Sequence, residues 1–107
     1  KTINNIETRI KKAKSIEEKD RTALLKHLST LKSEVMELSK THADHAESIT
    51  GFTQVSAHEA TREKKNPDLI KLSLSGLTSS VDELESSYPK LVAAVNKISQ
   101  ILANMGI

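Results

Sequence analysis

Apolar residues recur at alternating spacings of four and three along the C-terminal third of this chain. The stripe comprises Ile70, Leu74, Leu77, Val81, Leu84, Tyr88, Leu91, Val95, Ile98, Leu102 and Met105. This spacing places all of these side chains on one face of a helix, where they need a partner helix for burial. The pattern predicts helical packing, and by itself it indicates no chemistry.

The composition narrows the kind of core that such helices can form. The 107 residues make about one domain, 1–107, and they include one Phe, one Tyr and no Trp. The core must therefore consist mainly of aliphatic residues, and each large one stabilises a fold by roughly 1.5–3 kcal/mol when buried. Three Gly and two Pro are too few turn residues for a hairpin-rich β fold. We predict an all-α chain.

A short helix is expected at the start of the chain, over about residues 2–14. Its apolar side chains recur at helical spacing, at Ile3, Ile6, Ile10 and Ala13. Ser15 followed by Glu18 has the pattern of a capping box, and Asp20 is a second N-cap candidate. The chain is therefore expected to pause around residues 15–20 before a second helix begins.

The second helix is expected to be long, from about residue 18 to about residue 64. One heptad phase continues through this segment, at Leu24, Leu28, Leu31, Val35, Leu38, His42, His45, Ile49 and Phe52. No Pro interrupts it, and Gly51 costs only about 1 kcal/mol relative to Ala. Such a helix spans roughly 70 Å at ~1.5 Å per residue. A break near His42 or Gly51 would instead give a compact chain, with a radius of gyration near ~13 Å.

Asn66 and Pro67 form the clearest helix boundary in the sequence. Asn is a preferred N-cap, and Pro is preferred at the first helical position. A tight reversal is expected here, followed by a helix over about 67–86 and another over about 88–105. Pro89 either kinks one helix or separates two, because its ring crowds the preceding turn. The predicted fold is an antiparallel hairpin of two long helices, the second kinked or split at Pro89, with the short N-terminal helix beside it.

A stripe of small residues runs beside the heptad stripe of the second helix. Its members are Ala43, Ala46, Thr50, Thr53, Ala57 and Ala60. Small side chains allow another helix to approach closely. The short N-terminal helix cannot cover this face along its whole length, so we expect two copies to pair into a dimeric helical bundle with these residues at the interface.

The C-terminal segment resembles a known family. Leu84 and Glu85, then Tyr88-Pro89-Lys90-Leu91, and finally the ending Leu102-Ala103-Asn104-Met105-Gly106-Ile107 are similar to a bacterial family of short helical proteins, the domain of unknown function numbered forty-four zero four. That family usually reads Glu-x-x-His-Pro-x-Leu and closes on Leu-Ala-Asn-Met-Gly-Ile. Here Tyr88 stands where His is common, and the middle section from 43 to 65 is longer. The resemblance implies an intracellular helical protein and assigns no activity.

Histidines are the obvious candidates for a metal site. His42 and His45 stand three residues apart, a spacing that can present two imidazoles to one ion, with Asp44 nearby. In the predicted hairpin, the region of Glu85 and Tyr88 lies at the same level. A structural site normally needs four ligands, and this set is incomplete. A polar layer that fixes helix register is the simpler interpretation, so we predict no metal and no cofactor.

His27 raises a separate hypothesis, that of phosphoryl transfer. The helix around it is weakly similar to phosphoacceptor helices, in which an exposed imidazole accepts a phosphoryl group. The Gly-rich or Pro-bearing context of those motifs is missing around His27, so a solvated surface residue is the simpler interpretation. A small metal- or phosphoryl-binding bundle that uses His42 and His45, or His27, is the alternative function.

The remaining patterns disfavour enzymes, nucleic-acid binding and membrane binding. The chain has no Cys, and His58-Glu59 lacks the second His of a metalloprotease motif. Basic residues cluster over 9–14 without an aromatic platform for bases. No apolar run could cross a bilayer, and the visible start lacks the apolar core of a signal peptide. We predict a non-enzymatic cytoplasmic helical module that forms a homodimer and binds another protein, with neither nucleic acid nor membrane as a partner.

Overall fold

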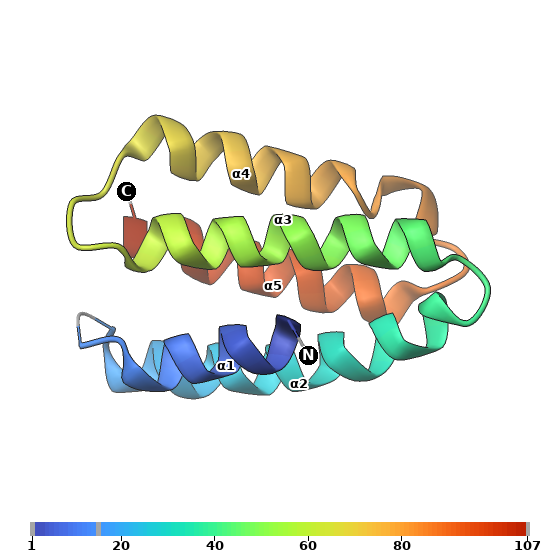
Figure 1. The fold of residues 1–107 in the computed structure, drawn as a ribbon, viewed down its shortest axis with the longest axis horizontal. Coiled ribbons are helices and arrows are strands. Elements are labelled where there is room, and N and C mark those ends of the chain that lie inside the picture. Colours follow the sequence, from blue (N-terminus) through green and yellow to red (C-terminus); the bar gives the residue numbers. More distant parts are fainter. Residues whose placement is uncertain (1, 15, 107) are drawn as a thin grey trace.

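The chain forms a bundle of antiparallel helices. The computed structural model describes residues 2–14 and 16–106. Its elements are α1 (Thr2–Lys12), α2 (Glu18–Ser39), α3 (Ala43–Thr61), α4 (Pro67–Ser79), a short 3₁₀ helix η1 (Asp82–Leu84) and α5 (Pro89–Gly106). Successive α-helices run in opposite directions (Figure 1). The prediction of an all-α chain is confirmed, since the described residues contain no strand. None of their helices is both long and apolar enough to span a membrane.

The C-terminal heptad stripe lies in the core, as its pattern predicts. Its members from Ile70 to Leu102 are buried, apart from the partly exposed Tyr88. The stripe is divided between α4, the following loop and α5, because the chain reverses there instead of continuing as one helix. Of the two alternatives at Pro89, the structure therefore shows separate helices. α5 packs against α2, α3 and α4 and lies in the middle of the bundle (Figure 1).

The long helix expected over residues 18–64 is two helices in the structure. α2 ends at Ser39, and the chain reverses through residues 40–42 before α3 begins. The amide of His42 still donates to the Leu38 carbonyl over 2.8 Å, but His42 then adopts φ −136° and ψ 63°, which ends the helical path. Because α3 folds back along α2, the radius of gyration is 12.8 Å and the molecule measures 37 × 24 × 20 Å. The elongated hairpin is therefore wrong, and the break near His42 is the alternative that the structure shows.

Arg21 of α2 holds the end of α1. Its guanidinium donates to the carbonyls of Lys11 and Ala13, both over 2.8 Å, and to the Ile10 carbonyl. Carbonyls at the end of a helix lack partners within the helix, so the guanidinium caps α1 from its neighbour. Asp20 lies inside α2 and is not an N-cap. Ser15, the predicted start of the capping box, lies outside the described residues.

The predicted boundary at Asn66 and Pro67 is confirmed in atomic detail. The Asn66 Oδ1 atom accepts hydrogen bonds from the amides of Asp68 and Leu69, over 3.0 and 3.3 Å. Pro67 follows as the first residue of α4. This cap satisfies two of the amides that a helix start leaves without partners, and it fixes the return of α4 along α3.

Candidate interaction surface

The stripe of small residues on α3 faces the other helices of the same chain. Ala46, Thr53, Ala57 and Ala60 are each at most 3% exposed, whereas Ala43 lies exposed and Thr50 is partly buried. α1, α2, α4 and α5 all pack against α3. Four of the six members of the stripe are therefore covered within the chain and are not available to a second copy in this fold. This corrects the predicted interface.

Large apolar side chains lie exposed on α3 and α4 instead. Phe52 and Val55 on α3 are 40% and 48% exposed, and Leu69 and Leu72 on α4 are 39% and 69% exposed. We call these four residues the α3/α4 patch. The heptad phase predicts Phe52 in the core, but after the turn at 40–42 the buried positions of α3 include its neighbour Thr53. Phe52 consequently points outward.

The patch borders a groove of about 390 Å³ between α3 and α4. The aromatic ring of Phe52 packs against Gly76 at one end of this groove. A Cβ atom on Gly76 would lie only 2.4 Å from the Cε1 atom of Phe52, so any side chain there would displace the ring. Serines complete the lining, at Ser73, Ser75 and Ser79.

Glu59 is the one charged residue that lines this groove within the described part of the chain. It is 9% exposed, and its carboxylate lies 2.8 Å from the Arg62 guanidinium and 3.9 Å from the His58 imidazole. The charge of the carboxylate is thus balanced by Arg62, the residue that follows α3. An aromatic, apolar centre with few free charges is typical of the core of a protein interface.

The groove continues past Phe52 toward the beginning of α3. A hollow of about 520 Å³ there shares Phe52, Gly76 and Ser79 with the first groove. Asp44 and Glu83 line its far end. The Nε2 atom of His45 hydrogen-bonds the backbone carbonyl of Ser80, which ties the first turn of α3 to the end of α4. Together the two hollows form a surface along the α3 and α4 pair that is apolar in its middle and acidic at one end.

The histidines that the sequence singles out do not form a shared site. His42 lies exposed in the turn at 40–42, with its Nδ1 atom 2.8 Å from the Thr41 hydroxyl, while His45 is engaged with Ser80. In the part of the chain that the structure describes, no hydrogen bond joins either one to Tyr88 or Glu85, and no three His, Cys, Asp or Glu residues are placed to hold a metal.

His27 lies half-buried on α2. Burial lowers the pKa of its imidazole below the ordinary value of 6.5, and the positive charges of Lys26 and Lys97 lower it further. The hypothesis of phosphoryl transfer required an exposed imidazole, and this imidazole is only partly accessible.

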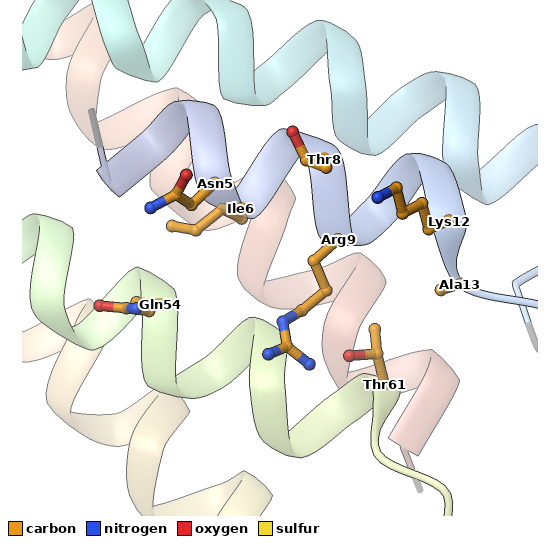
Figure 2. Close-up of a pocket in the computed structure, with 8 residues that line it drawn as sticks. All are labelled: Asn5, Ile6, Thr8, Arg9, Lys12, Ala13, Gln54 and Thr61. Atoms are coloured by element: carbon orange, nitrogen blue, oxygen red, sulfur yellow. The ribbon is translucent and has the colours of Figure 1, made fainter.

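A second groove, of about 440 Å³, lies between α1 and α3 (Figure 2). Figure 2 shows the Arg9 guanidinium reaching from α1 toward α3, with Lys12 one turn further along α1. Both cations are exposed, so water already solvates them and screens their charge. The apolar side chains of the α3/α4 patch, in contrast, gain free energy when they leave water. We therefore take the α3/α4 patch as the candidate functional surface.

Sequence reasoning missed this patch, although the sequence carries a signal for it. Leu69 and Leu72 fall outside the heptad stripe that begins at Ile70, and Val55 falls outside both stripes of the second predicted helix. Large apolar residues that a core stripe does not explain are the signal for an exposed surface of this kind.

No family model, no curated protein and no solved structure matches this chain. The resemblance of its C-terminal segment to a bacterial family of unknown function stays a prediction. The interpretation of the α3/α4 patch therefore depends on its own residues.

Proposed function

We propose that this chain is a non-enzymatic helical interaction module that self-associates through the α3/α4 patch. The observation that carries the proposal is the cluster of four large apolar side chains exposed on two adjoining helices, Phe52, Val55, Leu69 and Leu72. Burial of apolar surface is favourable by about 25 cal/mol per Å². Contiguous exposed apolar residues mark association sites, whereas single ones, such as Met36 on α2, are ordinary.

The spacing of the four residues supports a helical partner. Phe52 and Val55 are three residues apart on α3, and Leu69 and Leu72 are three apart on α4, so each pair projects from one side of its helix. Two antiparallel helices of this kind present ridges and a groove that fit another pair of helices. A second copy of the chain offers such a pair, and the result is a four-helix contact between two bundles.

A charge placed in the patch tests the proposal. Leu72 is 69% exposed, so Leu72→Glu should leave the fold intact while it puts a carboxylate into the buried centre of the contact. Met36→Glu is the matched control, because Met36 is 63% exposed and lies on α2, outside the patch. Sedimentation equilibrium at micromolar concentration should report a dimer for the wild type and for Met36→Glu, and a monomer for Leu72→Glu.

Two outcomes would contradict the proposal. One is a wild-type chain that stays monomeric and folded over the whole micromolar range. The other is a Leu72→Glu variant that dimerises as tightly as Met36→Glu, which would place the contact on another face.

A further inference from the structure

The two loops that flank α4 carry opposite charges. Before α4, residues 62–66 contain Arg62, Lys64 and Lys65 with a single carboxylate, Glu63. After α4, residues 80–88 contain Asp82, Glu83 and Glu85 and no cation. The loops lie at opposite ends of the bundle (Figure 1). The α3/α4 patch lies between them, so it is bounded by a basic loop at one end and an acidic loop at the other.

The groove joins the patch to the acidic end, and at the other end its lining stops at Glu59 and Leu69, next to the basic loop. At the acidic end, Glu83 and Asp44 line the groove directly. At the basic end, Arg62 pairs with Glu59 over 2.8 Å, and the charge of Glu63 offsets one of the exposed lysines Lys64 and Lys65, so the loop keeps one excess positive charge. A partner that lies along the groove and extends over the neighbouring basic loop therefore meets apolar surface in the middle and charges of opposite sign at the two ends.

We propose that the occupant of this groove is a second copy of the chain in antiparallel orientation, with a two-fold axis near the middle of the α3/α4 patch. The inference rests on the proposed function and adds the orientation of the pair. The basic loop of each copy then faces the acidic loop of the other. A face with opposite charges at its ends complements its own copy when that copy is turned end for end, whereas parallel pairing would bring like charges together.

The area that a stable interface buries also indicates that the contact includes the loops at both ends of α4. Specific interfaces bury roughly 800 Å² on each partner. Four side chains that are between 39% and 69% exposed offer less area than this, so the contact has to extend along α3 and α4 to the loops. The loops then form a charged rim around an apolar centre, which is the usual anatomy of an interface.

Charge reversal in the two loops tests the orientation. The basic-loop variant combines Lys64→Glu with Lys65→Glu, and the acidic-loop variant combines Glu83→Lys with Glu85→Lys. Each variant alone carries two loops of the same sign, so its self-association should weaken by at least about tenfold. A mixture of the two variants restores opposite charges at both ends of the contact. Sedimentation of that mixture should report a heterodimer with an affinity close to that of the wild-type homodimer.

A matched control separates loop contacts from net charge. Lys11→Glu with Lys12→Glu makes the same change in charge at the same end of the bundle, but on α1, which lies away from α4 (Figure 1). This control should dimerise like the wild type. The Lys65 Nζ atom also donates to the Met105 carbonyl over 3.1 Å, so Lys64→Glu alone carries the test if thermal melting shows that the double change unfolds the chain.

The outcomes distinguish this inference from the proposed function. A dimeric wild type whose loop variants associate as tightly as the α1 control would overturn the antiparallel arrangement and leave self-association intact. Weakened loop variants whose mixture recovers no affinity would also overturn it. A monomeric wild type would contradict the proposed function itself.

Discussion

α3 and α5 pack against each other in the middle of the bundle, but they bury opposite kinds of side chain (Figure 1). α5 buries large aliphatic residues, with Leu91, Val95, Ile98 and Leu102 each at most 1% exposed. α3 buries one large apolar residue, Ile49, together with Glu59 and the small residues Ala46, Thr53, Ser56, Ala57 and Ala60. α5 thus supplies the volume of the core, while α3 supplies a surface that neighbouring helices can approach closely.

The residues that stabilise a single chain are therefore different from the residues that we propose to join two chains. The large side chains of α5 are used for folding, because they are enclosed by α2, α3 and α4. The large side chains Phe52 and Val55 of α3 remain exposed and add little to the stability of one chain. Substitutions in α5 should therefore change unfolding, and substitutions on the outer side of α3 should change self-association.

The largest effect is expected from removing volume in α5. Ile98→Ala should lower the free energy of unfolding by about 2–5 kcal/mol, because it leaves a cavity among fully buried neighbours. In a dilute sample, Phe52→Ala should lower the free energy of unfolding by clearly less, since its ring is 40% exposed. The same substitution should weaken the dimer. Urea denaturation of dilute samples measures the free energy of unfolding of the two variants. Equal losses would contradict the distinction between the core side of α5 and the outer side of α3.

Added volume in α3 should have the next largest effect. Ala57→Leu should destabilise the monomer by about 1–3 kcal/mol, because Ala57 is 2% exposed and has no room for a larger side chain. Val55→Leu is the control on the same helix, and it should leave thermal stability nearly unchanged because Val55 is 48% exposed. If Ala57→Leu folded as stably as the wild type and altered only the dimer, the small-residue stripe would be an external surface after all.

The two helical glycines Gly51 and Gly76 differ in the space around them, so the same substitution should have different effects at the two positions. Gly51→Ala on α3 should stabilise the chain by up to about 1 kcal/mol, because an added Cβ meets nothing within 4 Å. Gly76→Ala on α4 should show less gain, since its Cβ must push the Phe52 ring aside, and it should weaken self-association. Thermal melting and sedimentation of the two variants decide this, and identical behaviour would mean that Phe52 is not seated on Gly76.

The smallest effect concerns pH. Burial and the nearby Lys26 and Lys97 lower the pKa of His27, so between that pKa and 6.5 the unfolded chain binds the proton more readily than the folded chain. Stability should therefore fall as the pH decreases below about 6.5, and His27→Gln should reduce this dependence. His42→Gln, at an exposed position, serves as the control in urea melts at several pH values. An unchanged pH dependence in His27→Gln would mean that His27 is not the source of the loss of stability at low pH.

The helices and much of the core follow from local pattern. Ile3, Ile6 and Ile10 are buried as their spacing predicts, and Asn66 caps α4 as its residue type predicts. These features depend on neighbours in the sequence, so local rules suffice for them.

The reversal at residues 40–42 could not be predicted in the same way. Leu38, His42, His45 and Ile49 continue the heptad spacing across it, and neither Gly nor Pro marks a turn. The chain reverses because folding α3 back on α2 buries both apolar faces in one molecule, which is a long-range effect. That one turn decides which stripe of α3 is buried, and so it also decides where the candidate surface lies.

The most direct test of the account is a dilution series followed by two-dimensional NMR of the backbone amides. On concentration from low to high micromolar, shifts should move at the outer residues of α3 and α4, around Phe52, Val55 and Leu72, and in the two loops that flank α4. Amides of α1 and of the buried face of α5 should stay in place. Concentration-dependent shifts confined to α1 and α2, or no shifts at all, would contradict the claim that the α3/α4 patch is a self-association surface.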